Sequence, residues 1–155
     1  TGSYALAYAY KTVDEWRYYP RYDNRHSINL ALEVNIGAGW SASAVWIYNS
    51  GMPFTPSIGY YDKLYMGDFR EIWDVYENYL PFSILGDKNI GRLPEYHRMD
   101  ISLSKKMDLG FMRLGIDLSI INVYDRENIF YFDRNTGEII NMLPFLPTAT
   151  IKVEI

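Results

Sequence analysis

The chain has 155 residues, the size of one ordinary domain, and 48% of them are hydrophobic. Its net charge of −4 argues against a nucleic-acid partner, because proteins that bind nucleic acids present a basic face. The absence of cysteine excludes disulfides, and no apolar run approaches the roughly 20 residues of a membrane helix. Aromatic residues make up 17% of the chain, which suits either sugar binding or the aromatic girdles of a membrane protein.

Six segments alternate apolar and polar residues with a period of two, the pattern of a β-strand with two different faces. In the most regular segment, Ile28 and Leu30 fall on one face, and Asn29 and Ala31 on the other. Several segments reach the ~9–11 residues with which a tilted strand crosses a bilayer. The predicted strands cover residues 3–11, 26–36, 40–49, 96–107, 112–124 and 145–155.

The connections between the predicted strands alternate in length. The second and third strands are joined by little more than GAGW and the fourth and fifth by DLGF, whereas residues 12–25, 50–95 and 125–143 form long connections. Short periplasmic turns and long external loops are the layout of an outer-membrane barrel. Trp40 lies at a short turn and Tyr48 near a long loop, where girdles would lie. We therefore predict an all-β, antiparallel transmembrane β-barrel segment of about six strands.

The longest connection contains a different periodicity. Over residues 67–82, GDFREIWDVYENYLPF, apolar residues recur at helical spacing from Phe69 to Leu80. Pro81 would end such a segment. We predict a short amphipathic helix within this external loop.

Six strands are too few for a membrane barrel, which must close because an open edge leaves unpaired amides in lipid. Single-chain bacterial barrels begin at about eight strands. We therefore expect residues 1–155 to be the C-terminal portion of a larger barrel, or one of several chains that close a barrel together. Ile151, Val153 and Ile155 lie on the last strand, which would close the ring against the first. That strand, TATIKVEI, resembles the signal that the barrel-assembly machinery recognises.

Five phrases resemble the C-terminal part of TonB-dependent outer-membrane receptors, particularly those of the Bacteroidetes group. In chain order they are YPRYDNRHSINLAL, WIYNSGMPFTP, RLPEYHRMDISLSKKM, INVYDRENIFYFD and LPFLPTATIKVEI. They follow the order of the family and span nearly the whole chain. The resemblance implies a barrel of about 22 strands with a plugged lumen, of which these would be the last six.

The resemblance also implies active uptake across the bacterial outer membrane. The partners it implies are the rest of the barrel, an N-terminal plug that this sequence lacks, TonB acting on that plug, outer-membrane lipid and lipopolysaccharide. The cargo would be a small molecule, a glycan or a peptide. We expect no cofactor.

Two short motifs group histidine, arginine and aspartate. They are Asp23, Arg25 and His26, and His97, Arg98 and Asp100. A hydrolase or metal site needs such groups to converge on one point. Each motif lies where a long loop enters a strand, so a polar network at the rim or in the lumen is the alternative that we favour. No nucleophile triad, phosphate loop or dinucleotide fingerprint is present, and we expect neither an enzyme nor a metal site.

Three further groups are candidates for sites. The loop carboxylates Asp62, Asp68, Glu71, Asp74 and Glu77 suit either a hard cation or, more simply, a solvated acidic surface. Loop aromatics could contact ligand or pack on one another and on lipopolysaccharide: Phe54, Tyr60, Tyr61, Tyr65, Trp73, Tyr76 and Tyr79. Residues expected to face the lumen, touching plug or water, are Lys11, Glu33, Asn35, Arg98, Asp100, Arg113, Asp117, Lys152 and Glu154.

Two other functions fit the same pattern. The chain could be a structural subunit that completes a barrel with a partner chain and has no uptake function. It could also be a soluble β-barrel carrier of the lipocalin kind, with its apolar face inward and its polar face outward.

Overall fold

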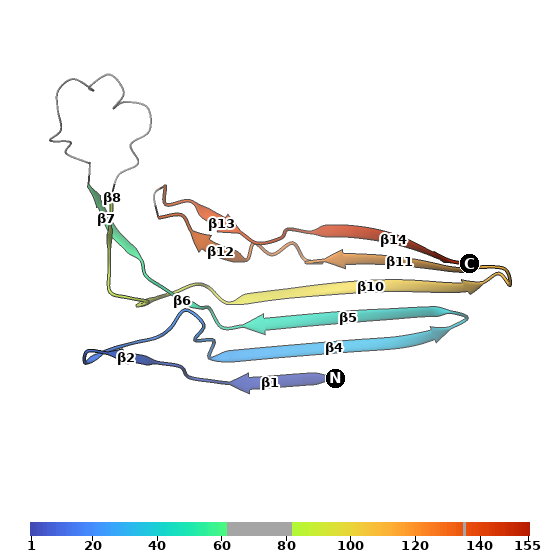
Figure 1. The fold of residues 1–155 in the computed structure, drawn as a ribbon, viewed down its shortest axis with the longest axis horizontal. Coiled ribbons are helices and arrows are strands. Elements are labelled where there is room, and N and C mark those ends of the chain that lie inside the picture. Colours follow the sequence, from blue (N-terminus) through green and yellow to red (C-terminus); the bar gives the residue numbers. More distant parts are fainter. Residues whose placement is uncertain (62–81, 135) are drawn as a thin grey trace, which may run out of the picture.

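The structure, a computed structural model, describes residues 1–61, 82–134 and 136–155. Six strands form one antiparallel sheet in which the spatial order follows the chain order (Figure 1). This confirms the prediction of an all-β chain with about six antiparallel strands. The strands are β1 (Gly2–Leu6), β4 (His26–Gly37), β5 (Trp40–Asn49), β10 (Tyr96–Asp108), β11 (Arg113–Ile121) and β14 (Leu146–Glu154).

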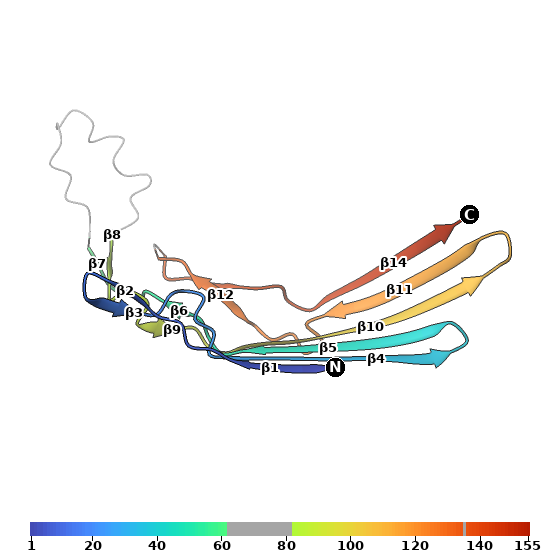
Figure 2. The same ribbon diagram turned by 60° about the horizontal axis from the view of Figure 1, so that its bottom comes forward.

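The sheet is a single curved layer, and β14 bends away from the plane of β1, β4 and β5 (Figure 2). Within the described residues β1 and β14 are its two edges. Tight turns at residues 37–40 and 108–113 join β4 to β5 and β10 to β11 at one end. We call this the short-turn end.

The opposite end of the sheet carries all the longer connections. We call it the loop end and define it as residues 7–25, 50–61, 82–95, 122–134 and 136–145. It contains four two-stranded ribbons (Figure 1). They pair β2 (Lys11–Val13) with β3 (Trp16–Tyr18), β6 (Pro53–Phe54) with β9 (Gly91–Arg92), β7 (Ser57–Tyr61) with β8 (Phe82–Leu85), and β12 (Ile129–Phe132) with β13 (Ile139–Asn141). The helix predicted over residues 67–82 lies almost wholly outside the described residues.

The first strand is shorter than its alternation predicts. β1 ends at Leu6, opposite His26, because the partner strand β4 begins there. Beyond this point the amide of Ala9 donates to the carboxylate of Asp23, at 2.8 Å, in place of a ladder partner. The predicted strand over residues 3–11 is therefore too long, since Lys11 lies in β2 at the loop end, and a lumen-facing Lys11 stays a prediction.

The register gives the sheet two chemically different faces. Glu33 pairs with Ser43, Ser43 with Ser102, Ser102 with Ser119 and Ser119 with Thr148, so one row crosses five strands on a polar face. The other predicted lumen-facing residues of the sheet share this face: Asn35, Arg98, Asp100, Arg113, Asp117, Lys152 and Glu154. The opposite, apolar face carries Ile28, Leu30, Leu32, Val34, Trp46, Met99, Ile101, Leu103, Leu114, Ile116, Leu118, Ile151 and Val153.

Nothing among the described residues covers the apolar face. None of their hydrophobic side chains is buried, and Leu32 keeps 62% of its surface exposed. A sheet in a globular protein buries its apolar face against another layer. No helix of the described residues is long and apolar enough to cross a membrane.

The turn at residues 37–40 requires glycine at one position. Gly39 has a φ of 78°, and a Cβ there would lie 2.2 Å from the carbonyl oxygen of Lys106 on β10. Any side chain would therefore push β5 away from β10. Lys105 sits beside this turn, where its ammonium group donates to the carbonyl of Ala38 at 2.6 Å and lies 4.9 Å from the ring of Trp40.

Candidate ligand-binding cleft and its polar support

The buried polar and charged residues of the described chain lie at the loop end. They are Asp23, Asn89, Asn122 and Asn128, and each keeps 7% or less of its surface exposed. Buried polar groups need hydrogen-bond partners, and each of these four has several. The loop end is therefore held together by polar side chains rather than by an apolar core.

Asp23 connects three segments of the loop end. Its carboxylate accepts from the amide of Ala9 and from the guanidinium of Arg92, and lies 3.7 Å from the Nε of Arg25. Arg92 also donates to the carbonyls of Asp23 and Gly51, at 3.2 and 2.9 Å. Burial acts to raise the pKa of Asp23, but the Ala9 amide and the two guanidinium groups outweigh it and hold the pKa below its ordinary value of 3.8.

Asn89 joins the first long connection to the second. Its amide nitrogen donates to the carbonyl of Tyr19 at 2.7 Å, while its backbone N–H donates to the hydroxyl of Thr55 at 3.0 Å. The Thr55 hydroxyl in turn donates to the side-chain oxygen of Asn89 at 3.2 Å. Asn89 has a φ of 57°, a conformation that asparagine tolerates better than most residues.

Asn122 and Asn128 fix the third connection. The side chain of Asn122 donates to the carbonyls of Arg126 and Leu143, at 3.0 and 3.1 Å, and accepts from the amide of Arg126 at 3.1 Å. Asn128 forms a two-way bond with the backbone of His97, at 2.9 and 3.2 Å. Both asparagines therefore imitate a backbone partner where the regular ladder has ended.

The two histidine motifs do not form a convergent site. His26 and His97 each meet a tyrosine hydroxyl, of Tyr4 at 2.9 Å and of Tyr124 at 2.7 Å. Arg98 pairs with Asp100 at 2.9 Å on the polar face, opposite to the face of His97. No group of three or more metal-ligating side chains occurs among the residues that the structure describes. The acidic residues Asp62, Asp68, Glu71, Asp74 and Glu77 lie outside those residues.

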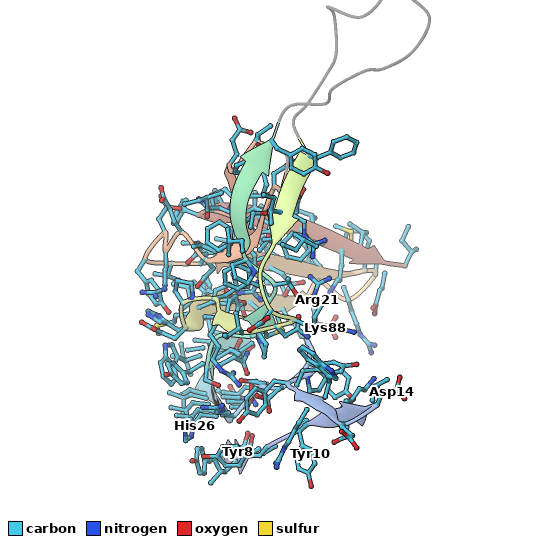
Figure 3. The ribbon with its side chains drawn as sticks, turned by 90° about the vertical axis from the view of Figure 1, so that its left-hand side faces the viewer. Tyr8, Tyr10, Asp14, Arg21, His26 and Lys88 are labelled. Carbon is cyan, nitrogen blue, oxygen red and sulfur yellow. The ribbon has the colours of Figure 1, made fainter. Side chains whose placement is uncertain are left out.

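A cleft of about 930 Å³ opens between three parts of the loop end: the turn at residues 21–22, the β6–β9 and β7–β8 ribbons, and the β12–β13 ribbon. Figure 3 looks onto this end of the molecule, with Arg21 below the β7–β8 ribbon. Its charged, polar and aromatic lining includes Arg21, Tyr22, Phe54, Thr55, Tyr60, Asn89, Phe130, Tyr131, Phe132, Asp133 and Arg134.

One wall of the cleft is fixed by close packing. The ring of Phe54 lies against Gly91, where a Cβ would come within 2.9 Å of the ring, and it packs on Phe132 at 5.2 Å between centroids. Tyr60 approaches the β12–β13 turn, because its hydroxyl lies 3.8 Å from the Cβ position of Gly137. These contacts join β6, β7 and the β12–β13 ribbon around the same opening.

The loop aromatics predicted as ligand contacts separate into three groups. Phe54 and Tyr60 line the cleft. Tyr61 stacks on Phe82 at 5.3 Å, away from the lining. Tyr65, Trp73, Tyr76 and Tyr79 lie outside the described residues.

Sequence reasoning missed the third connection as a source of cleft residues. Phe130, Tyr131 and Phe132 form a run of aromatics that begins two positions after Asn128, and Arg21 and Tyr22 lie in the turn from Pro20 to Asp23. The sequence FYF at residues 130–132 could have indicated a binding surface, because aromatic residues in a loop have no core to fill.

No protein-family model, no curated protein and no solved structure matches this chain. Function is therefore inferred from the two-faced sheet, the loop end and the cleft.

Proposed function

We propose that residues 1–155 are the C-terminal barrel wall and external loops of a TonB-dependent outer-membrane receptor that imports a nutrient. The observation that carries this proposal is the uncovered apolar face of a single-layer, six-stranded antiparallel sheet. Lipid is the cover that such a face needs when no second protein layer is present.

Aromatic residues mark both ends of the apolar face. Near the loop end, Tyr48 packs on Trp46 and His97 packs on Tyr124, while Trp40 stands at the short-turn end. Tyr48 follows Trp40 by eight positions, which is about 27 Å along a strand and about 20 Å of membrane height at a tilt of ~40°. The apolar band of such barrels is about 25 Å tall. The spacing of these rings therefore supports a bilayer crossing.

The polar face suits a lumen filled by protein and water. Two ion pairs lie within this face: Arg98 with Asp100, and Lys152 with Asp117 at 3.0 Å. Apart from Lys105 beside the short turn, the charges of the sheet lie on this face, and the apolar face has none at mid-depth, which avoids the ~2–4 kcal/mol that a lipid-exposed Arg or Lys costs. In this proposal the two sheet edges continue into the rest of the barrel, and a plug contacted by TonB fills the lumen.

One observation favours the soluble carrier as a second candidate. The apolar face carries a hollow of about 710 Å³, lined among others by Leu32, Val34, Ala42, Ala44 and Leu103. The small side chains of Ala42 and Ala44 leave this space between larger neighbours. A carrier with its apolar face inward would place a ligand there.

The test is to recover the native polypeptide from the cell envelope with an antibody to residues 96–107. We expect it in the outer-membrane fraction, released only by detergent, with a denatured mass several times the 18.1 kDa of residues 1–155. A soluble polypeptide would contradict the proposal in favour of the carrier. A membrane polypeptide near 18.1 kDa would contradict it in favour of a structural subunit that completes a barrel with a partner.

A further inference from the structure

We infer that the loop-end cleft binds a small organic anion with a flat, ring-containing body. Calling that anion the cargo rests on the proposed function, whereas the binding itself does not. The volume of about 930 Å³ falls within the ~300–1,000 Å³ of small-molecule sites.

The cleft carries two arginines that differ from most other arginines of the chain. Arg25, Arg92, Arg98 and Arg126 each pair with a carboxylate. In contrast, Arg21 and Arg134 line the cleft and have no carboxylate partner among the described residues. A guanidinium presents a rigid fork of donors that matches a carboxylate. The cleft therefore keeps its cationic groups for a ligand.

Three aromatic side chains of the lining remain largely exposed. Tyr22, Phe130 and Tyr131 keep 66%, 55% and 40% of their surfaces exposed. Phe130 and Tyr131 meet edge to face at 5.3 Å between centroids, and the ammonium group of Lys11 lies 5.6 Å from the ring of Tyr22, which leaves much of each ring exposed. Exposed rings favour stacking on a flat partner. The combination of guanidinium groups without a carboxylate partner and rings with exposed surface selects an anion with a planar body.

The polar groups of the lining favour an anion over a neutral sugar. A sugar requires several polar groups that are free to exchange hydrogen bonds with its hydroxyls. Thr55 and Asn89 bond to each other, and Asn89 also bonds to Tyr19. The carboxylate of Asp133 accepts from the amide of Thr136 at 3.3 Å. The side chains of Thr55 and Asn89 are thus used by the protein itself, and the two arginines are the groups of the lining that favour an anion over a neutral sugar.

The experiment compares 2-naphthoate with its neutral isostere 2-naphthamide. Each compound is titrated against the full-length polypeptide in an uncharged detergent, by calorimetry, with a detergent-only blank to remove micelle partition. We expect naphthoate to bind about tenfold more tightly, or about 1.4 kcal/mol, because a hydrogen bond between a guanidinium and a carboxylate is stronger than one to a neutral amide. Arg21→Gln combined with Arg134→Gln should abolish this preference.

Two variants act as controls. Arg17→Gln should leave the preference unchanged, because Arg17 lies over the ring of Tyr10, at 3.8 Å, outside the cleft lining. Tyr131→Ala should weaken both compounds alike. Equal binding of acid and amide, no binding of either, an unaffected arginine double variant, or preferential binding of maltohexaose would each overturn the inference. Because binding is measured rather than uptake, a positive result on a protein that is absent from the outer membrane would reject the receptor proposal alone.

Discussion

The sheet and the loop end are stabilised in opposite ways. The sheet has regular ladders and a continuous apolar face, yet none of its hydrophobic side chains is buried. The loop end has short, irregular ribbons, yet it holds the buried polar side chains of the described chain. The part that looks more regular is therefore the part that depends more on its surroundings.

The difference follows from where each region obtains its free energy. Burial of apolar surface contributes about 25 cal/mol per Å², and in the sheet this contribution comes only when lipid or another layer covers the apolar face. In the loop end, Asp23, Asn89, Asn122 and Asn128 already have their partners within the chain. We expect substitutions in the sheet to act through the membrane and substitutions in the loop end to act locally.

The largest effect is expected from a charge on the apolar face. Leu32→Arg places a guanidinium at the middle of β4 and should cost about 2–4 kcal/mol of folding free energy in a bilayer. The measurement is the free energy of unfolding from lipid vesicles in urea. Glu33→Arg, the neighbouring residue on the polar face, is the matched control and should cost much less. Equal costs for the two variants would show that lipid does not cover the apolar face.

The next effect tests the polar support of the loop end. Asn122→Ala removes the partners of the Arg126 amide and of the Leu143 carbonyl, and it places alanine at a φ of 57°. We expect a loss of about 2–3 kcal/mol, from unsatisfied buried groups and backbone strain together. Hydrogen exchange at the Arg126 amide measures it.

Asn122→Gly separates the two causes. Glycine accepts a positive φ without strain, so this variant should recover roughly 1 kcal/mol of the loss and leave the hydrogen-bond contribution. Exchange rates in the six-stranded sheet should stay unchanged in both variants. Equal acceleration throughout the sheet would instead mean that the two regions unfold as one unit.

Asp23 predicts a pH dependence that is confined to the loop end. Its pKa is below the ordinary value of 3.8 in the folded chain, so its carboxylate adds stability above that value. This stability is lost as the pH falls through the lowered pKa. Asp23→Asn should remove the pH dependence and cost about 1–3 kcal/mol at neutral pH, because the guanidinium groups of Arg92 and Arg25 lose their counter-charge.

Exchange of the Ala9 amide reports this change directly, since that amide donates to Asp23. Asp87→Asn is the control, because Asp87 is an exposed carboxylate of the same region. A wild-type protein whose Ala9 protection does not fall in acid, after correction for intrinsic exchange, would contradict the prediction.

The strands could be predicted from sequence because period-two alternation is a local property. Residues 26–36 and 40–49 were predicted within one residue of β4 and β5. The end of β1 could not be predicted this way. Tyr8 and Tyr10 continue the alternation, but the segment that would pair with them forms a turn between Pro20 and Asp23, before β4 begins. A strand ends where the neighbouring strand stops pairing with it, and the alternation within its own residues does not show where that is.

The contacts of the loop end were beyond sequence reasoning for a similar reason. Asp23 meets Arg92, which is 69 positions away, and Asn89 meets Tyr19, which is 70 positions away. The alternation could, however, have predicted one feature of the motif. His97 and Arg98 are adjacent in a strand, so their side chains must point to opposite faces of the sheet. That fact alone argues against a convergent site at the motif.

The smallest expected effect decides whether the polar face is wet. Ser43 and Ser102 share a hydroxyl hydrogen bond of 2.8 Å on neighbouring strands. Ser43→Ala, Ser102→Ala and the double variant form a cycle whose coupling energy should be about 0.2–1 kcal/mol if water competes for the hydroxyls. Unfolding from vesicles measures the free energy of each variant in the cycle.

A plug packed on the row of Ser43 and Ser102 would exclude water. The hydrogen bond between the two hydroxyls would then give a larger coupling energy, because a low local dielectric strengthens it. A coupling well above this range only when the plug is present would therefore place the plug against Ser43 and Ser102. A large coupling without the plug would contradict a water-exposed polar face, which the soluble carrier requires as well.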